Sequence, residues 1–371
     1  MKFIKLTLKY FRNFLTIFTI TFIISIIIDF VFGNLILKSL NSYLVKTEFY
    51  GRLIRIDHEY YHHTLKANVI YNKEKSFNEF YKFCTDNNGF KYKCGKKRSK
   101  NFDFAFMGDS FTEGVALRYE DTFVGIFEKE KNISVANLGV TSYAPNIYLS
   151  KTKYLIENGY RFNHLIVFLD ISDLYDDSVF YKLNDDFTVG EKKAEEKNLK
   201  IRKYLRKNFP LTNYYLYVIK MNNRLNKTLP PTKSDVPIFD KRSELKAKWT
   251  YQKNQYVEGY AEKISTTKEK MIATMSELHS LLKKNDIKLS IAVYPWPQQI
   301  KNDVVNSQHV NMWRHFCVSR CENFINFFPI FFKEKNQTSY LSVYKKFYFW
   351  NDVHFNAAGN KLIADNLLEV F

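Results

Sequence analysis

Residues 102–114 read Phe-Asp-Phe-Ala-Phe-Met-Gly-Asp-Ser-Phe-Thr-Glu-Gly. The apolar run from Phe102 to Met107 predicts a buried strand, and the glycine-containing stretch after it predicts a turn. A serine on a turn at the end of a strand lies at the open edge of a sheet. We therefore expect the hydroxyl of Ser110 to meet a substrate at that edge.

A second informative segment lies close to the C-terminus, where residues 351–359 read Asn-Asp-Val-His-Phe-Asn-Ala-Ala-Gly. Serine, histidine and aspartate are the residue types that covalent acyl transfer uses as nucleophile, base and orienting group. His354 lies in a compact Asp-x-His segment before a helix, whereas the other candidate histidines lie in strand or helix patterns that indicate packing or exposure. We predict that Ser110 is the nucleophile, His354 its base and Asp352 the carboxylate that orients the imidazole.

From residue 102 onward, strand and helix patterns alternate. The predicted strands are 102–107, 133–137, 165–170, 288–294 and 323–328, and the predicted helices are 119–131, 145–159, 259–284, 310–321 and 356–371, the last one with Asn356 as its N-cap. Alternating strands and helices with short connections indicate a parallel sheet that is covered on both faces. The fold class is α/β, and we predict a three-layer α/β/α sandwich around a parallel five-stranded sheet.

The N-terminus predicts a membrane helix. Four basic residues precede an apolar run from Phe14 to Phe32 that is broken only by Thr, Ser and Asp29, and about 20 apolar residues span a bilayer. We predict a cytoplasmic tail at 1–12, a transmembrane anchor at 13–37 and a catalytic domain outside the cytoplasm, periplasmic or on the cell surface. The alternative is a cleaved signal peptide, although no A-x-A site follows. Asp29 is expected near the outer interface, where a charge costs less.

A polar, aromatic-rich connector is predicted at 38–100, before the hydrolase-like domain at 101–371. Its histidines, His58, His62 and His63, have a spacing that could bind a metal on a helix, but three histidines without a clear fourth ligand more often pack or lie at the surface. We expect no metal here and a contribution to the wall of the site instead. Cys84 and Cys94 flank a turn and suit a disulfide, whereas Cys317 and Cys321, four apart on a predicted helix, are as consistent with two thiols.

An insertion at about 176–258 interrupts the alternation. It is charged at 191–207, aromatic at 214–217 and turn-like at Pro230-Pro231. Such an excursion either shapes a substrate groove or partner surface, or is a mobile solvated segment.

The chain has 371 residues and a net charge of +18. A basic chain invites a nucleic-acid interpretation, but Lys is spread along the sequence, often beside Asp or Glu, and no nucleic-acid-binding motif is present. We expect no nucleic-acid partner and favour anionic lipid or glycan.

Acyl transfer also needs donors for the oxyanion. The backbone N–H of Ser110 is one candidate, and Gly139, in Asn-Leu-Gly-Val after the second strand, is another because it has no side chain. The third strand ends in Asp170-Ile171-Ser172-Asp173 at the same carboxyl edge, where open α/β sheets bind ligands. Asp173 is therefore a candidate substrate-binding residue.

These residues resemble the SGNH, or GDSL, hydrolase family over roughly 102–371. Gly-Asp-Ser-Phe-Thr at 108–112 is similar to its first block, Gly139 matches the glycine of its second block, and Asp352 and His354 are similar to its last block. The resemblance implies a flavodoxin-like, SGNH hydrolase type of sandwich. Two positions depart from the family pattern. Ser172 stands where an oxyanion-donating Asn is usual, and because a hydroxyl can donate one hydrogen bond, Ser172 is a third candidate donor. Asn351 stands where the Asp three residues before His is usual.

The Asp-x-His spacing is similar to the branch that includes alginate O-acetylation proteins. That resemblance implies a serine esterase or O-acetyltransferase that acts on acetylated cell-surface polysaccharide, without a cofactor, and implies for a transferase an acyl-donor protein in the membrane. Trp296, in Tyr-Pro-Trp-Pro-Gln-Gln at 294–299, either stacks on a sugar or packs within its loop. The alternatives are a catalytically inactive glycan-binding or scaffold protein of the same fold, and a membrane-surface protein that uses its positive charge without chemistry.

Overall fold

The computed structural model describes residues 2–40, 54–76, 79–192 and 241–371, and between 192 and 241 only residues 201, 204–205, 208–216, 219 and 236–239. Contacts divide the chain into two compact units, residues 1–50 with 193–226 and residues 51–192 with 227–371. The predicted insertion is therefore shared between the two units. Much of its charged stretch, and the turn predicted at Pro230-Pro231, lie outside the described residues.

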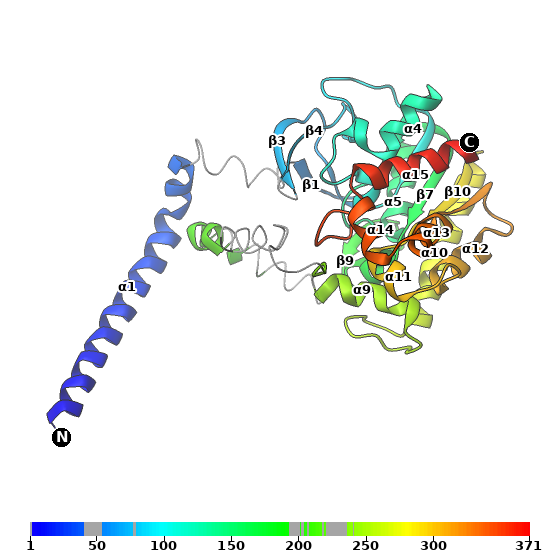
Figure 1. Cartoon of the computed structure of the whole chain (residues 1–371). Coiled ribbons are helices and arrows are strands. Elements are labelled where there is room, and N and C mark those ends of the chain that lie inside the picture. The colour runs from blue at the N-terminus through cyan, green and yellow to red at the C-terminus, as the bar shows by residue number, and fades with distance from the viewer. Residues whose placement is uncertain are drawn as a thin grey trace. The chain divides into compact units, whose positions relative to one another are not determined.

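A five-stranded parallel sheet forms the centre of the second unit (Figure 1). Its strands are β5 (Asn101–Met107), β6 (Val135–Asn137), β7 (Arg161–Leu169), β10 (Lys288–Val293) and β11 (Asn323–Asn326). Their order across the sheet is β11-β10-β7-β5-β6, and every neighbouring pair is parallel. This is the order of flavodoxin-like folds, in which the second strand along the chain lies outside the first. The predicted sheet is confirmed.

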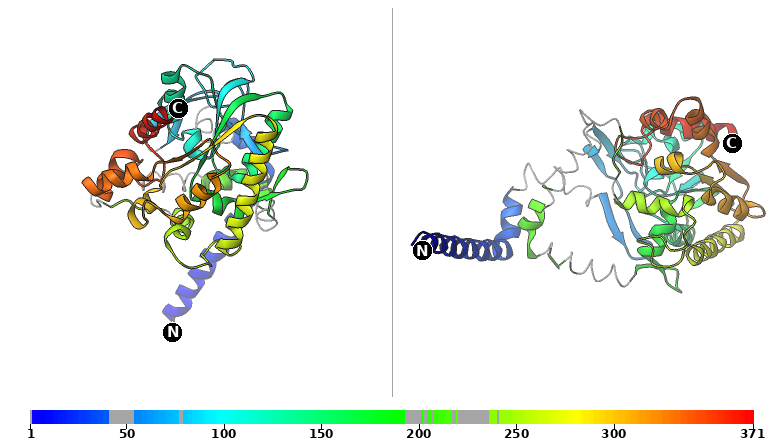
Figure 2. Two further views of the ribbon diagram at one scale, coloured as in Figure 1. Left: turned by 90° about the vertical axis from the view of Figure 1, so that its right-hand side faces the viewer. Right: turned by 60° about the horizontal axis from the view of Figure 1, so that its bottom comes forward.

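Helices cover both faces of the sheet, which gives the unit three layers (Figure 2). On one face α4 (Phe123–Lys131) packs against α15 (Ala357–Val370), and on the other α5 (Pro145–Glu157) packs against α10 (Ile264–Lys284). α12 (Gln308–Cys317) follows β10 and leads into β11. Asn356 caps α15 as predicted, because its side chain accepts a hydrogen bond from the N–H of Gly359.

Shorter elements surround this framework. They are α3 (Ser110–Glu113), η1 (Tyr119–Asp121), α6 (Ser172–Val179), β8 (Tyr181–Leu183), β9 (Val189–Glu191), α9 (Lys241–Tyr251), α11 (Pro297–Asn302), α13 (Phe328–Gln337) and α14 (Tyr340–Phe347). Of these, α3 and α6 begin directly after the carboxyl ends of β5 and β7. That edge is where an open parallel sheet places its ligands.

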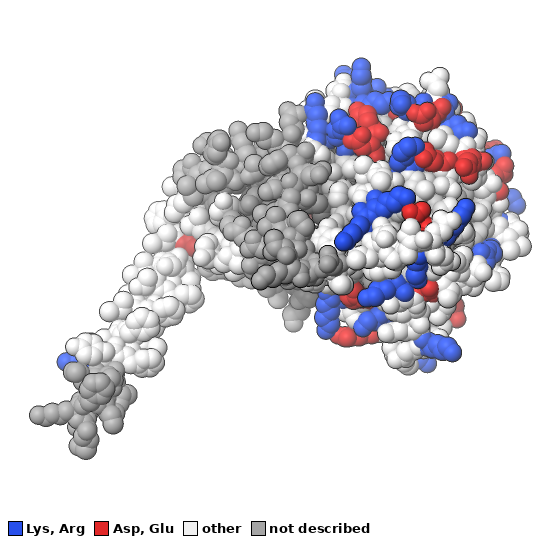
Figure 3. Space-filling view, viewed as in Figure 1, with Lys and Arg blue, Asp and Glu red and all other residues white. Residues whose placement is uncertain are grey.

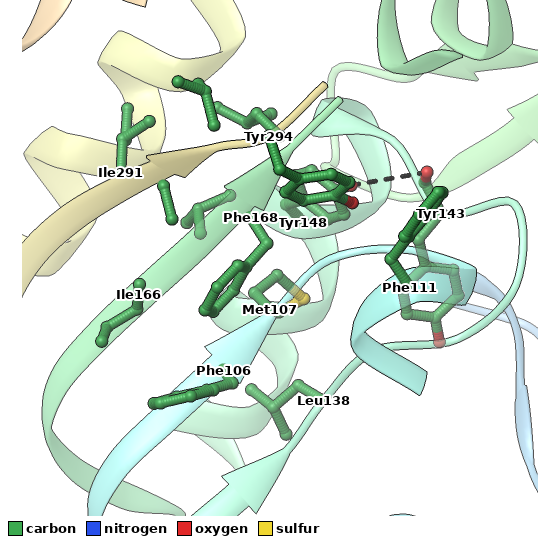
Figure 4. Packing of buried hydrophobic residues seen from close by; sticks show 14 of the residues in the cluster. Phe106, Met107, Phe111, Leu138, Tyr143, Tyr148, Ile166, Phe168, Ile291 and Tyr294 are labelled. Atoms are coloured by element: carbon green, nitrogen blue, oxygen red, sulfur yellow. Dashed lines mark hydrogen bonds between the residues drawn. The ribbon is translucent and has the colours of Figure 1, made fainter. Parts of the chain in front are cut away.

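The central strands are buried on both faces, which is why they read as nearly continuous apolar runs. Phe106 and Met107 of β5, Ile166 and Phe168 of β7 and Ile291 of β10 have no exposed surface (Figure 4). Such dense packing holds the strand ends, and the turns that follow them, in fixed positions.

The sequence predicts a connector at 38–100, but the structure folds residues 54–76 and 79–100 into the second unit. β1 (Arg55–His58) pairs with β2 (His62–Leu65), and β3 (Ile70–Ser76) pairs with β4 (Glu79–Cys84), both antiparallel. Leu65 and Phe83 of these hairpins are almost fully buried in the main core. The short strands carry many charged and aromatic residues, so no clear apolar alternation marks them in the sequence.

Disulfides join Cys84 to Cys94 and Cys317 to Cys321. The first was expected from the turn between the two cysteines. The second was left open because cysteines four apart on a helix are poorly placed to bridge. In the structure α12 ends at Cys317, so Cys321 lies beyond the helix and that objection does not apply.

The first unit contains α1 (Lys2–Leu40). Its segment Lys9–Ile36 is the one helix in the described part of the chain that is long and apolar enough to cross a membrane. The predicted span at 13–37 overlaps this segment. Figure 3 shows that α1 presents mainly uncharged side chains, whereas Lys and Arg alternate with Asp and Glu over the visible face of the second unit.

Candidate active site

Ser110 is the first residue of α3, just beyond the carboxyl end of β5. Asp109 caps this short helix, because its Oδ1 accepts a hydrogen bond of 3.0 Å from the N–H of Phe111. The helix ends at Gly114, whose left-handed φ of 71° suits a residue without a side chain. The nucleophile candidate therefore lies on a tight turn at the sheet edge, as residues 102–114 predict.

His354 brings the C-terminal segment to this turn. Its Nε2 lies 2.7 Å from the Oγ of Ser110, and its Nδ1 is hydrogen-bonded to the Oδ1 of Asp352. The same Oδ1 accepts a bond of 2.9 Å from the backbone N–H of His354. Asp352 thus fixes both the ring and the backbone of His354, and the three residues are linked in the order that nucleophilic serine catalysis requires.

The loop that carries Asp352 and His354 is braced by aromatic side chains. The hydroxyl of Tyr344 accepts a hydrogen bond of 3.0 Å from the N–H of Asp352, and Tyr348 pairs with Phe355 across the loop. The ring of Phe111 lies 4.8 Å from that of His354. The imidazole is therefore held in place without a substrate.

The surroundings favour a basic imidazole. Burial opposes the charged form of His354, but the carboxylate of Asp352, with further support from Asp109 and Asp170, raises its pKa above the ordinary value. The side chains of His354 and Asp352 are 19% and 17% exposed. A base with a raised pKa takes the proton of a serine hydroxyl more readily once it is itself deprotonated.

The three predicted oxyanion donors differ in availability. Ser110 is at the start of α3, where a backbone N–H has no partner within the helix. The N–H of Gly139 already donates to the Oδ1 of Asn137 at 3.1 Å. The residue is also needed for packing, because a Cβ at 139 would lie 2.6 Å from the Cβ of Thr112. Gly139 therefore serves the fold whether or not it donates to a substrate.

Ser172, the third candidate, begins α6 and is 2% exposed. Its N–H donates to the Oδ1 of Asp170 at 2.6 Å, which fixes the turn after β7. No hydrogen bond of its hydroxyl to another described residue is found. That hydroxyl is therefore free to rotate toward a ligand.

Asp109, Asp170 and Asp173 form a buried carboxyl cluster beneath the site. Burial first, and then the charge of Asp170, raises the pKa of Asp109 well above its ordinary value. The same causes act on Asp173, whose oxygens also accept bonds from the N–H of Asp170 at 2.7 Å and the hydroxyl of Tyr148 at 2.6 Å. Only 1% of Asp173 is exposed. This geometry favours a structural role for Asp173 over the predicted contact with substrate.

Trp296 is also buried, with 5% of its surface exposed. Its indole Nε1 donates to the Oδ2 of Asp170 at 2.7 Å, and its ring lies 6.2 Å from that of Phe111. The rings of Phe111 and Tyr294, both labelled in Figure 4, lie 4.8 Å apart in the same buried region. The packing alternative for Trp296 is therefore favoured over stacking on a sugar.

A brace that the sequence did not reveal joins β1 to the turn that carries Ser110 and to the loop after β6 that contains Gly139 and Thr141. Glu113, at the end of α3, is fully buried and forms an ion pair with Arg55. The carboxylate of Glu113 also accepts bonds from Thr141, at 2.7 Å from its N–H and 2.9 Å from its hydroxyl. Burial would raise the pKa of Glu113, but Arg55, Lys91 and Thr141 hold it below the ordinary value. Arg55 was hidden because it belongs to the region predicted to be a connector.

The three histidines of β1 and β2 lie near this brace rather than on a helix. His63 Nε2 lies 2.9 Å from the carbonyl oxygen of Thr141, and burial lowers the pKa of His63 to about 3. His62 and His63 meet through their Nδ1 atoms at 2.8 Å. His63 therefore packs against the loop that contains Gly139 and Thr141. Within the described part of the chain, no three His, Cys, Asp or Glu side chains are grouped to hold a metal ion.

A cavity of about 280 Å³ lies among α5, α6, β8 and α10. Its lining includes Asp177, whose carboxylate lies 3.3 Å from the backbone N of Asn146 at the start of α5, and Lys192 and Lys270. Ser110, Asp352 and His354 do not line it.

The fold and the site together define a class of protein. The fold is a three-layer α/β/α sandwich with the strand order of flavodoxin-like folds, and at the carboxyl edge of its sheet a serine, a histidine and an aspartate are linked by hydrogen bonds. No model of a protein family matches the chain, and no curated protein matches it.

Among solved structures, the chain is similar to a lipolytic protein of the G-D-S-L family from Veillonella parvula, with 12% identity over 72% of this chain and 97% of that one and a TM-score of 0.38. It is also similar to a catalytic mutant of an acetylxylan esterase from Geobacillus stearothermophilus, with 11% identity over 72% and 93% and a TM-score of 0.40. A GDSL-like lipase from Bacteroides thetaiotaomicron shows 10% identity over 73% and 87% and a TM-score of 0.34. These likenesses are distant, and the roles of the residues follow from the geometry of this chain.

Proposed function

We propose that this protein is a serine-dependent ester hydrolase or O-acyltransferase that acts on acetylated cell-surface polysaccharide through an acyl-enzyme on Ser110. The observation that carries the proposal is the distance of 2.7 Å between His354 Nε2 and Ser110 Oγ, with Asp352 on the other ring nitrogen. Two segments far apart in the sequence meet here in the arrangement that a Ser-His-Asp catalytic triad requires.

In the proposed acylation step, His354 Nε2 takes the proton of Ser110 as Oγ forms a bond to the acetyl carbonyl carbon. The carbonyl oxygen becomes an oxyanion, which the N–H of Ser110 and the hydroxyl of Ser172 stabilise. The N–H of Gly139 joins them if the substrate displaces Asn137. The bond to the sugar oxygen then breaks, and the imidazolium returns the proton to that oxygen.

In the second step, an incoming hydroxyl group attacks the acyl-enzyme. His354 removes its proton, and Ser110 leaves with a proton returned from the imidazolium. Water as acceptor gives an esterase, and a sugar hydroxyl gives a transferase. The two outcomes differ in how well the occupied site excludes water.

We place the enzyme on the outer side of a membrane, held by α1. The basic residues before the apolar run favour a cytoplasmic N-terminus. Disulfides persist mainly in oxidising compartments, and both cysteine pairs of the second unit are bridged. The choice of a carbohydrate as substrate rests on the resemblance of the Asp352-Val353-His354 spacing to the alginate O-acetylation branch, and a transferase would take its acetyl group from a membrane acyl-donor protein.

The test uses the full-length chain in detergent. A fluorophosphonate probe should modify Ser110, located by mass spectrometry, and the chain should hydrolyse p-nitrophenyl acetate. Ser110→Ala should abolish both, whereas Ser276→Ala should change neither, because that hydroxyl bonds only to the carbonyl of Ile272 in its own helix.

Acetylated alginate and acetylated xylan, with and without a sugar acceptor, then separate hydrolysis from transfer. The inactive glycan-binding alternative is considered because Ser172 departs from the family pattern. It would be favoured if the probe leaves Ser110 unlabelled and no ester is turned over, while a glycan still binds.

A further inference from the structure

Asp29 breaks the apolar run of α1, and the structure shows what it binds. Its Oδ1 accepts a hydrogen bond of 2.8 Å from the N–H of Leu211, and its Oδ2 accepts one of 2.8 Å from the N–H of Thr212. The residue is 3% exposed. Both oxygens of this carboxylate are therefore used by the insertion, within the unit that contains α1.

The insertion needs a cap at this point. Residues 210–216 are helical, and the helix starts after Phe209, whose carbonyl accepts from the N–H of Asn213 at 3.0 Å. Pro210 suits the first helical position because it has no N–H to leave unpaired. Phe209 has no side-chain oxygen, so it cannot cap the next two N–H groups as Ser or Asp would. Asp29 caps them from another helix, and its charge complements the positive helix end.

Residues on either side of this carboxylate also pack α1 against the segment that contains Phe209 and Pro210. The rings of Phe30 and Phe209 lie 5.9 Å apart. A Cβ at Gly33 would lie only 2.8 Å from the Cγ of Pro210, so the glycine allows the close approach. Figures 1 and 2 show the short helix beside the C-terminal part of α1.

The exposed side chains among the described residues between 208 and 219 include large apolar ones. Tyr215 and Leu216 are 67% and 59% exposed, and Ile219 is 40% exposed. The sequence from 208 to 219 has no charged residue, whereas 197–207 contains Lys197, Lys200, Arg202, Lys203, Arg206 and Lys207 and no acidic residue. Tyrosines beside a basic stretch are typical of a membrane–water interface with anionic lipid headgroups.

The position of Asp29 along α1 also places the short helix at a membrane interface. About 30 Å of helix separates Lys9 from Asp29, which matches the thickness of the hydrocarbon core. With Lys9 at the inner boundary, Asp29 and the helix it caps lie at the outer boundary, where in-plane apolar helices bind.

We propose that residues 208–216 form a second membrane-binding segment, which lies at the outer interface against α1 with Asp29 as its cap and binds a bilayer that contains anionic lipid. This rests on the proposed role of α1 as a membrane span, and it requires α1 to be retained rather than removed as a signal peptide. The chain would then return to the membrane after β9 before it completes the hydrolase fold.

The first test joins the two elements. The four native cysteines are all in disulfides, so Phe30→Cys with Phe209→Cys, in the full-length chain in vesicles, can be linked by a short bifunctional thiol reagent. Phe18→Cys with Phe209→Cys is the control, since position 18 lies three turns earlier on α1. We expect linking at 30/209 at least fivefold above the control, lost with Asp29→Leu and kept with Ser25→Ala, whose hydroxyl bonds only within α1.

The second test asks what covers the helix. An environment-sensitive dye on Tyr215→Cys should be quenched at least twofold by spin-labelled lipid in phosphatidylglycerol vesicles, and less in pure phosphatidylcholine. The same dye on Val318→Cys, which is 81% exposed in the second unit, should be quenched only by aqueous iodide.

The proposal would be overturned if iodide quenched the dye at 215 as strongly as the dye at 318. It would also be overturned if a protein partner protected the dye at 215 from both quenchers. A mature N-terminus that begins after α1 would overturn it as well as the proposed anchor, whereas esterase activity is measured separately and reports only on the site.

Discussion

Lys151 donates a hydrogen bond of 2.9 Å to the carbonyl of Leu138, in the peptide group whose N–H belongs to Gly139. The lysine is 1% exposed and lies among the rings of Tyr61, Phe90 and Tyr143. Burial lowers its pKa to about 7. A buried lysine thus holds the loop that contains Gly139, whereas lysine side chains usually lie at the surface.

The lowered pKa of Lys151 predicts a stability that rises with pH. The unfolded chain binds a proton at this lysine up to about pH 10.4, whereas the folded chain releases it near 7, so the free energy of unfolding should rise between those values, by on the order of 3–5 kcal/mol. Urea unfolding of the full-length chain at several pH values measures this. Lys151→Met should remove that rise, whereas the exposed Lys361→Met should keep it. The same rise in Lys151→Met would contradict the assignment.

Because Arg55 and Glu113 form an ion pair, we expect removal of Arg55 alone to destabilise the fold more than removal of both charges. Arg55→Ala leaves a buried carboxylate without its cation and should destabilise the fold by about 2–3 kcal/mol, less than a fully buried pair because Arg55 is 28% exposed. Adding Glu113→Gln should recover part of the loss, since the amide carries no charge and still accepts from Thr141. Arg118→Ala, which breaks an exposed pair with Asp121, should cost below about 1 kcal/mol.

The depressed pKa of Glu113 adds a pH signature to the same brace. Its stabilisation is present above the unfolded pKa of 4.5 and is lost as the pH falls through the lower folded value. Unfolding of the wild type should therefore become easier in that acidic range, and Glu113→Gln should be less sensitive to it. Equal acid sensitivity of both proteins would show that Glu113 is not the group responsible.

The raised pKa of His354 sets the expected pH profile of ester turnover. The base must be neutral to accept the proton of Ser110, so kcat/KM should rise with pH along a limb whose midpoint lies above 6.5. Asp352→Asn removes the nearest carboxylate, so the midpoint should move to lower pH, and the rate should fall by about 10³–10⁴-fold. A midpoint that does not move would mean that Asp352 does not set the charge of His354.

Much of the fold was predictable because its strands are buried on both faces and read as apolar runs that alternate with helices. Ser110 and His354 were predictable because each lies in a turn of unusual composition. Their meeting could only be hypothesised, since nothing local in the sequence fixes a contact between segments so far apart.

The missed features share one cause: each is a charged or polar residue whose partner is distant in sequence. Arg55 and Lys151 are basic residues that composition places at the surface, yet in the folded chain Lys151 is buried and Arg55 is half-buried against loops of the site. Asp29 interrupts an apolar run, and the sequence gives no local reason for it because its partners lie in the insertion. Asp173 was a candidate for substrate contact and Trp296 was left between sugar stacking and packing. Their hydrogen bonds, to Tyr148 and to Asp170, favour structural roles for both.

Substitution of Ser172 tests whether its hydroxyl stabilises the oxyanion in place of the asparagine that is usual at this position. Its hydroxyl is the candidate side-chain donor at the start of α6, and loss of one oxyanion donor costs about 10²–10³-fold in kcat. Ser172→Ala should lower kcat for p-nitrophenyl acetate by about that factor with little change in KM, because the bond strengthens only as the oxyanion forms. Ser178→Ala in the same helix, whose hydroxyl accepts from the N–H of Ala261, should leave kcat unchanged. Unchanged kcat in Ser172→Ala would assign the oxyanion to the backbone N–H of Ser110, with or without Gly139.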